Sequence, residues 1–379
     1  MLVTELETPA LLLDVARLER NVERMRRALA RHGVPLRPHA KTAKCAEIVR
    51  LALAGQPGGI AVSTLREAEC FLERDIRDIL YAVGIAPGKL AHVAQLIRRG
   101  ADITVVLDGF EAAAALRESA AGHGVRFPVL IELDVDGHRA GVSPGSEKLL
   151  ELGGVLAASP GTELRGVMTH AGASYECRGV AAIEAMAERE RDGAVRAAGR
   201  LRAAGFPAPV VSVGSTPTAT FARSLDGVSE VRAGVYMFQD LVMAGLGVCA
   251  PDDIAVSVLV SVIGHQPQRG WVITDGGWMA LSRDRGTASQ ALDQGYGVAC
   301  DVAGRPLPED VIVASANQEH GILARRDGGP LDPARYPVGT LLRVLPNHAC
   351  ATAAQHGSYR VVAGEPPAVT ATWRRFGGW

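Results

Sequence analysis

The chain has 379 residues, which is enough for about two domains with sizeable hydrophobic cores. Its 40 Lys and Arg residues balance 41 Asp and Glu residues, and no basic or acidic block suggests a nucleic-acid partner. The content of 47% hydrophobic and 21% charged residues is typical of a globular enzyme and excludes a disordered chain. We therefore expect a small-molecule ligand.

The N-terminal segment carries Glu5 and Glu7 where a secretory signal needs positive charge. The longest apolar stretch, from Ile254 to Gly264, is interrupted by serines and is shorter than the ~18 residues of a membrane-spanning helix. The six cysteines show no paired spacing. We expect a cytoplasmic protein without a membrane span, in which each cysteine is a buried thiol by default or else has a chemical role.

The first predicted helix follows a candidate N-cap at Asp14 and ends before Gly33. Apolar residues recur in it at spacings of three and four, the period of a helix with one buried face: Val15, Leu18, Val22, Met25 and Leu29. Eight β-like runs then alternate with helical patterns. These runs are LRPHAK (36–41), GIAVST (59–64), DILYAV (78–83), ITVVLD (103–108), FPVLIELD (127–134), LRGVMTHAG (164–172), PVVSVGS (209–215) and EVRAG (230–234).

Eight βα units in about 230 residues match a (β/α)8 barrel better than an open doubly wound sheet, because no GxGxxG turn follows the first strand. Beyond residue 250, runs such as WVITDG, DVIVAS, TLLRVLP and YRVVAG recur without intervening helices. We therefore predict an α/β protein with a TIM-type barrel at 10–245 and a mostly antiparallel β domain at 246–379, which also takes in residues 1–9. The Ala-, Arg- and Glu-rich stretch 181–204 predicts a solvated barrel helix.

Reacting groups in such a barrel lie at the C-terminal ends of the strands. The first strand ends at Lys41 and Lys44, two of only four lysines in the chain. A lysine in a barrel mouth is suited to form a Schiff base with a carbonyl cofactor, and Lys41 is the candidate. The alternative is that both are ordinary surface lysines.

Other strand ends offer groups for a flat anionic cofactor. His170 and Tyr175 follow the sixth strand, and Arg139 follows the fifth. His138 is better explained as a hydrogen-bonded core residue. The seventh and eighth strands end in Gly214-Ser215-Thr216 and Gly234-Val235-Tyr236, where this fold often binds phosphate, although a GST turn is also a common helix N-cap.

In the predicted β domain, Pro346-Asn347-His348-Ala349-Cys350 ends an apolar run. The two-residue period of a strand would put His348 and Cys350 on the same side, and an imidazole with a thiolate suits zinc. Two protein ligands would leave positions open for water or substrate oxygens. The alternative is a buried cysteine beside an unrelated histidine. The stretch Ser315–Gly321 also contains polar groups, but its spacing assigns it no role.

The segments RPHAKTAK, DVDGHRAG, THAGASY and PNHAC resemble the fold type III pyridoxal-phosphate enzymes related to alanine racemase, in the branch of D-serine dehydratase and D-threonine aldolase. The resemblance covers nearly the whole chain. Ala43 departs from the histidine that is usual at its position, and this departure leaves the Schiff-base position intact.

The resemblance implies pyridoxal 5'-phosphate as the cofactor, with Lys41 as its Schiff-base and catalytic lysine. It assigns cofactor contacts to Arg139, His170, Tyr175, Ser215, Thr216, Gly234, Val235 and Tyr236. Arg232 would lie near the pyridine nitrogen, and His348 and Cys350 would bind Zn2+ or another divalent metal such as Mn2+. The resemblance also implies a homodimer whose two active sites are shared between subunits.

The activity that the resemblance implies is a lyase reaction, in which a D-3-hydroxy amino acid such as D-serine or D-threo-3-hydroxyaspartate is dehydrated to a 2-oxo acid and ammonia. A metal-dependent D-threonine or D-3-hydroxyaspartate aldolase is the first alternative, although aldolases are expected to carry Asp where this chain has Cys350. A non-catalytic pyridoxal-phosphate-binding protein is the second alternative. It would need Lys41 and the phosphate site, but neither the metal pair nor the second domain.

Overall fold

The computed structural model describes residues 1–379, and contacts divide them into two units. The β unit consists of Met1–Glu23 and Val235–Gly377, and the barrel unit of Arg24–Gly234 and Gly378–Trp379. The β unit thus includes 10–23 and 235–245, which the sequence analysis assigned to the barrel domain. Helix α1 (Val15–Ala30) crosses the boundary between the units and begins where it was predicted, with the Asp14 carboxylate accepting the Arg17 N–H at 2.9 Å.

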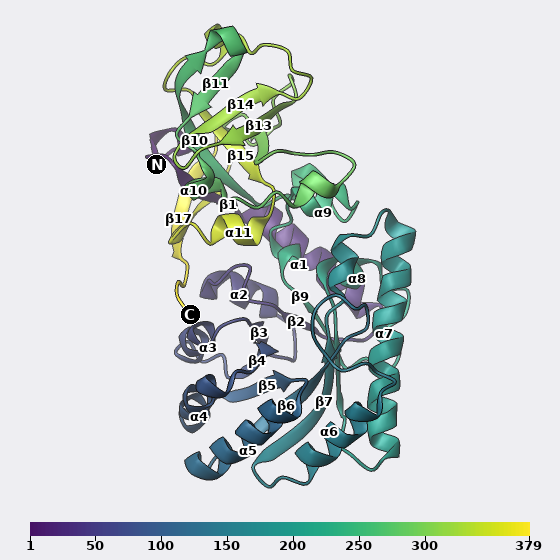
Figure 1. Cartoon of the computed structure of the whole chain (residues 1–379). Coiled ribbons are helices and arrows are strands. Elements are labelled where there is room, and N and C mark those ends of the chain that lie inside the picture. Colours follow the sequence, from purple (N-terminus) through teal and green to yellow (C-terminus); the bar gives the residue numbers. More distant parts are fainter. The chain divides into compact units, whose positions relative to one another are not determined.

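Eight parallel strands form the sheet of the barrel unit, in the order β2-β9-β8-β7-β6-β5-β4-β3 (Figure 1). A parallel bridge between His39 and Ala61 joins β2 to β3 and closes the ring. Each of the eight strands overlaps one of the eight predicted runs, so the predicted α/β barrel is confirmed. The strands are β2 (Leu36–Pro38), β3 (Ile60–Val62), β4 (Asp78–Gly84), β5 (Asp102–Leu107), β6 (Phe127–Leu133), β7 (Thr162–Thr169), β8 (Val210–Val213) and β9 (Glu230–Ala233).

One helix follows each of the first seven strands, and Figure 1 shows α4, α5, α6 and α7 along the outside of the sheet. These helices are α2 (Ala46–Leu53), α3 (Leu65–Leu72), α4 (Leu90–Arg98), α5 (Phe110–His123), α6 (Glu147–Ala157), α7 (Val180–Ala203) and α8 (Thr216–Phe221). Helix α7 was predicted to be a solvated helix, but the structure shows that one of its faces is buried. It buries a face of mostly small residues that also contains Glu190.

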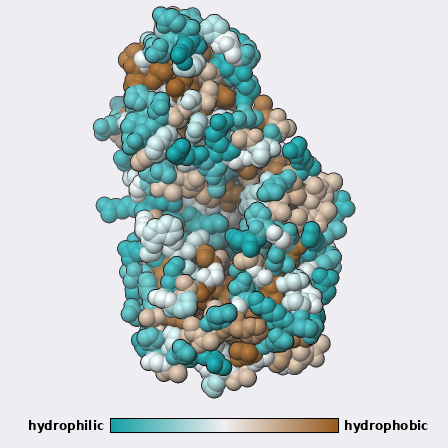
Figure 2. Space-filling view, in the orientation of Figure 1, coloured by the Kyte–Doolittle hydropathy of each residue, from teal (hydrophilic) through white to brown (hydrophobic).

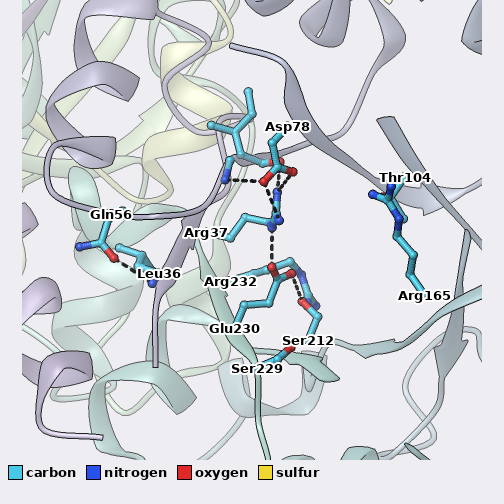
Figure 3. Close-up of polar contacts among 12 residues, drawn as sticks. Leu36, Arg37, Gln56, Asp78, Thr104, Arg165, Ser212, Ser229, Glu230 and Arg232 are labelled. Atoms are coloured by element: carbon cyan, nitrogen blue, oxygen red, sulfur yellow. Dashed lines mark hydrogen bonds and ion pairs between the residues drawn. The ribbon is translucent and has the colours of Figure 1, made fainter. Parts of the chain in front are cut away.

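The barrel interior is apolar in one layer and charged in another. Ala61, Leu80, Val106, Leu130 and Met168, one residue from each of β3 to β7, form a buried cluster. A separate polar network connects β2, β4, β8 and β9 (Figure 3). The charges in this network are paired, as charged groups inside a protein must be.

Within that network, the guanidinium of Arg37 lies 2.7 Å from both Asp78 and Glu230. Glu230 in turn accepts a hydrogen bond from Ser212, and Ser212 accepts one from Arg232. A chain of polar contacts therefore leads from Arg37 to Arg232, which is 3% exposed.

Nine strands form the sheet of the β unit, in the order β11-β14-β13-β12-β15-β10-β1-β16-β17, and an additional pairing of β10 with β11 closes six of them into an antiparallel barrel. Only β1 and β16 pair in parallel, so the predicted mostly antiparallel β domain is confirmed. The strands are β1 (Ala10–Asp14), β10 (Val256–Gln266), β11 (Trp271–Thr274), β12 (Gly297–Cys300), β13 (Val311–Ala316), β14 (Gly321–Arg325), β15 (Leu341–Pro346), β16 (Ser358–Ala363) and β17 (Ala368–Arg374).

Two buried clusters stabilise the β unit. Val3, Ala10, Leu12, Leu259 and Val362 form one, and Leu241, Ile254, Cys300 and Leu345 form the other. Three short helices complete the unit: α9 (Leu241–Gly245), α10 (Trp278–Leu281) and α11 (Ala349–Ala353).

Figure 2 shows mainly hydrophilic side chains on the visible face, interrupted by small hydrophobic patches. All six cysteines are free, and no helix combines the length and apolar composition needed to cross a bilayer.

Candidate active site

The structure distinguishes the two lysines at the end of β2. Lys44, whose φ is +45°, places its amine 3.2 Å from the buried carboxylate of Glu67. Lys41 is exposed in the preceding turn and forms no hydrogen bond or ion pair. That turn is fixed by the backbone, because Ala40 N–H donates to Ala61 O at 2.8 Å and Lys44 N–H donates to Ala40 O at 2.7 Å. The unpaired amine of Lys41 is therefore the one available for chemistry.

His170 follows β7 directly, and its ring orientation is fixed by a neighbouring strand end. Its Nδ1 lies 3.0 Å from the Gly214 carbonyl oxygen, which can only accept, so Nδ1 carries the hydrogen and Nε2 keeps its lone pair. The Tyr175 ring, in the turn Gly172–Tyr175, lies 6.1 Å from the His170 ring at 47°. Burial lowers the pKa of His170 to about 4, and the positive charges of Lys41, Arg232 and Arg139 add to this effect. His170 is therefore neutral at neutral pH.

The positive charges of Lys41, Arg139 and Arg232 all act on His170. Arg232 is buried and donates to the Thr169 carbonyl and to Ser212. The Arg139 side chain is 58% exposed in the loop after β6, with its guanidinium 3.4 Å from the Glu132 carboxylate. Burial raises the pKa of Glu132, while the charge of Arg139 opposes this shift. The three cations give the mouth of the barrel positive charge.

Ser215 and Thr216 begin α8. Ser215 Oγ accepts the Thr218 N–H at 3.2 Å, so the alternative of a helix N-cap is correct for Ser215. The same hydroxyl lies 2.8 Å from Ser174 Oγ, which joins this strand end to the turn after β7. Thr216 is buried as the first residue of the helix.

Gly234 comes directly after β9, where the backbone is closely packed. A Cβ atom at this position would lie 2.7 Å from Thr42 Oγ1 and 3.1 Å from His39 O. Only glycine fits there without displacing the turn that carries Lys41. The next predicted residues, Val235 and Tyr236, begin the second part of the β unit and are buried.

Glu190, near the middle of α7, is a residue that the sequence analysis missed. It is buried, and its carboxylate accepts hydrogen bonds from Ala171 N–H at 2.9 Å, from Gly214 N–H at 3.0 Å and from Thr218 Oγ1 at 2.8 Å. Burial raises the pKa of this carboxyl, and the three donors oppose that shift. A signal was present, since Glu190 follows Ile183 and Ala187 at the spacing of the buried face of the helix.

The prediction that a strand places His348 and Cys350 on the same side is wrong. Strand β15 ends at Pro346, and Cys350 lies in helix α11, so the strand period does not apply. The turn into the helix nevertheless brings the two side chains into hydrogen-bond contact. Burial lowers the pKa of His348, but its hydrogen bonds to Asp284 and Cys350 outweigh this effect and raise the pKa to about 11.

Residues that the sequence analysis did not select hold this turn in place. Asp240 accepts the N–H groups of Ala349 at 3.0 Å and Met243 at 2.9 Å, which ties α11 to α9. Asn347 donates to Thr287 Oγ1 and to Gly295 O, each at 2.7 Å. No group of three or more His, Cys, Asp or Glu side chains in the chain is arranged to hold a metal ion.

The polar stretch Ser315–Gly321 covers the end of β13, the turn that follows it and the first residue of β14. Its carbonyl groups bind the backbone of α10, with Trp278 N–H donating to Asn317 O at 2.9 Å and Met279 N–H donating to Gln318 O at 3.1 Å. This contact gives the stretch a structural role in supporting α10.

Comparison with protein families identifies both parts of the chain. A model of the alanine racemase N-terminal domain matches residues 13–241, and a model of a putative serine dehydratase domain matches residues 255–362. The chain belongs to the alanine racemase-like family. Within this family it falls among the fold type III pyridoxal-phosphate enzymes of the dehydratase and aldolase branch.

Within this family the chain is 52% identical over 376 residues to D-threo-3-hydroxyaspartate dehydratase from Delftia sp. (strain HT23), covering 99% of this chain and 98% of that protein. The solved structure of that enzyme matches with a TM-score of 0.97 over 100% of both chains at 51% identity. Another structure of it is a cysteine-to-alanine mutant in the metal-free form.

Two further relatives are more distant. A D-serine dehydratase from Dictyostelium discoideum is 28% identical over 379 residues, covering 95% of this chain and 94% of that protein. A 3-hydroxy-D-aspartate aldolase from Paracoccus denitrificans is 27% identical over 365 residues, covering 94% of this chain and 88% of that protein.

The barrel mouth fits the family's anionic cofactor. It combines the unpaired amine of Lys41 with the guanidinium groups of Arg139 and Arg232 and a neutral imidazole. His39 Nδ1 is also buried there without a hydrogen-bond partner. His348 and Cys350 fit a divalent ion as well, because an imidazole and a thiol are ligands that zinc prefers.

Proposed function

We propose that this chain is a dehydratase of D-3-hydroxy amino acids that uses pyridoxal phosphate and a divalent metal ion, with zinc as the expected metal. It would convert D-threo-3-hydroxyaspartate or D-serine to a 2-oxo acid and ammonia. The observation that carries the proposal is the 52% identity, along nearly the whole chain, to a D-threo-3-hydroxyaspartate dehydratase. The aldolase relative is only 27% identical.

Lys41, Arg139, His170, Tyr175, Ser215, Thr216, Gly234, Val235 and Tyr236 would hold the cofactor. When bound, pyridoxal phosphate supplies an electron sink for the negative charge that develops at the substrate Cα. The Lys41 amine has no competing partner, so it could bind the cofactor and, once the substrate's amino group has displaced it, accept the Cα proton as a general base.

His170 and Arg232 would control the electrostatics of the cofactor ring. His170 is neutral, because its pKa is about 4, and it presents an uncharged ring. Arg232 is held by two hydrogen bonds in the barrel interior and brings a fixed positive charge to the same mouth. These residues orient and polarise what binds there without exchanging protons at neutral pH.

His348 and Cys350 would hold the divalent ion in the β unit. Hydroxide is a poor leaving group, and a metal ion at this pair would supply Lewis-acid assistance to its departure from the β-carbon. The proton on His348 must leave when the metal binds, so we expect metal affinity to rise with pH.

The first test is a product assay. Purified protein, supplied with pyridoxal phosphate and zinc, is incubated with a panel of D-3-hydroxy amino acids, and ammonia, 2-oxo acid, glycine and aldehyde are measured. Ammonia with 2-oxo acid, abolished in Lys41→Ala, supports the proposal. Glycine with aldehyde would establish the aldolase alternative instead. If no product forms while the cofactor binds through Lys41, the chain is a non-catalytic carrier.

A homodimer with shared active sites and a cytoplasmic location also belong to this proposal, supported by the family resemblance and the sequence. Mixing inactive Lys41→Ala with inactive Cys350→Ala tests the dimer. If each site uses the barrel of one subunit and the β unit of the other, one site in each hybrid is intact, and about a quarter of wild-type activity returns. No recovery after subunit exchange would mean that each chain completes its own site.

A further inference from the structure

One carboxylate in the β unit, that of Asp284, contacts the proposed metal ligand His348. Asp284 Oδ2 lies 2.6 Å from His348 Nδ1, although the two residues are 64 positions apart in the sequence. The two side chains are 34% and 39% exposed, so they are partly protected from solvent. A carboxylate oxygen accepts, so the N–H at His348 Nδ1 donates to Asp284 Oδ2.

The loop that carries Asp284 is itself held in place. Asp284 Oδ1 accepts the Gly286 N–H at 2.9 Å, so both oxygens of the carboxylate are occupied. The start of the loop is tied to α11, because Thr352 Oγ1 donates to Leu281 O at 2.7 Å and His356 Nε2 lies 2.9 Å from Ala280 O. The carboxylate and the imidazole are thus fixed relative to each other from both sides.

This geometry determines which nitrogen of His348 can bind a metal ion. The Nδ1 hydrogen points to Asp284, which leaves Nε2 as the only nitrogen free to act as a ligand beside Cys350. Metal-binding histidines commonly donate their second N–H to a carboxylate, which fixes the tautomer and makes the ligand more basic.

We infer that Asp284 is a positioning residue that orients His348 Nε2 toward a divalent metal ion shared with Cys350. This inference rests on the metal site of the proposed function. Asp284 does not bind the metal itself, so its removal should weaken metal binding without eliminating either ligand.

Zinc protection of Cys350 from alkylation tests the inference without relying on activity. The protein, loaded with pyridoxal phosphate and stripped of metal, is titrated with Zn2+ and pulsed with iodoacetamide, and mass spectrometry measures alkylation of the Cys350 peptide. Asp284→Asn keeps an acceptor but loses the charge, and we expect half-protection at about 10-fold more zinc. Asp284→Ala loses both, and we expect about 100-fold more zinc.

The matched control is Asp327→Asn, which makes the same change at an exposed carboxylate paired with Arg325 in the same unit. It should protect Cys350 at the wild-type zinc concentration. Thermal unfolding and cofactor absorbance identify a variant that has lost its fold, in which case Asp284→Asn is the deciding variant. Wild-type zinc affinity in Asp284→Asn and Asp284→Ala overturns the inference while leaving the proposed function intact. If zinc fails to protect wild-type Cys350, the proposed metal site fails and the inference with it.

Discussion

The carboxylate of Glu190 lies 3.0 Å from the backbone nitrogen of Gly214 and so joins the middle of α7 to the end of β8. The same Glu190 oxygen accepts the Ala171 N–H at the end of β7. A single buried side chain therefore aligns two strand ends, one of which carries His170. It stabilises the barrel mouth without forming part of the exposed surface.

Removal of Glu190 should destabilise the barrel. Glu190→Ala leaves two backbone N–H groups and the Thr218 hydroxyl without their buried acceptor, and we expect the free energy of unfolding to fall by about 3–5 kcal/mol. Glu190→Gln keeps one acceptor oxygen and should cost less. Urea unfolding measures both. Glu188→Ala on the same helix is the control, and equal stability of the two Ala variants would contradict the role given to Glu190.

A methyl group at Gly234 should disturb the turn that carries Lys41. We expect Gly234→Ala to cost about 1–3 kcal/mol in the free energy of unfolding, because its Cβ would lie 2.7 Å from Thr42 Oγ1. It should also weaken the binding of pyridoxal phosphate, which is measured by absorbance. Gly199→Ala in α7 meets no atom within 4 Å and should instead stabilise the chain by about 0.5–1 kcal/mol. Unchanged cofactor affinity in Gly234→Ala would show that the close packing is irrelevant to binding.

The low pKa of His170 should appear as a pH-dependent stability. Between the unfolded pKa of 6.5 and the folded pKa of about 4, the unfolded chain binds a proton that folded His170 does not bind. The free energy of unfolding therefore falls as the pH falls through this window, by up to about 1.4 kcal/mol per pH unit for this group. Denaturant unfolding of the cofactor-free protein at pH 6.5 and pH 5 measures the change.

His170→Asn should remove that contribution, so we expect the variant to lose about 1–2 kcal/mol less than the wild type over the same pH range. His39, whose pKa burial also lowers, remains in both proteins. His320→Asn, at an exposed position, should behave as the wild type does. Identical pH dependence of wild type and His170→Asn would contradict a neutral, desolvated imidazole.

The ion pairs of Arg37 should contribute more than those at the surface. Arg37→Met leaves the carboxylates of Asp78 and Glu230 without their shared cation, and we expect a loss of about 3–5 kcal/mol in the free energy of unfolding. Arg325→Met breaks an exposed pair with Asp327 and should cost less than about 1 kcal/mol. A double-mutant cycle with Glu230→Gln, followed by urea unfolding, should give a coupling of about 1 kcal/mol or more. Additive losses would mean that the pair is not energetically linked.

Local sequence patterns were sufficient to predict the eight barrel strands, the antiparallel β domain and the lysine motif. Strands and helices repeat their apolar residues at periods of 2 and 3.6, and these periods are local properties that can be read without knowing any long-range contact. The motifs that carry the family resemblance are likewise short, continuous segments. Most candidate residues, including Lys41 and His170, could therefore be selected before the fold was known.

Tertiary structure decided everything that depends on partners distant in the sequence. Strand β1 belongs to the β unit because it pairs with β10 and β16. The ion pair that Lys44 forms with Glu67 engages the amine of Lys44 and leaves that of Lys41 unpaired. The roles of Glu190 and Asp284 follow from hydrogen bonds to residues that packing brings beside them. Local periodicity predicts which face of an element is buried, but not which side chain lies opposite it.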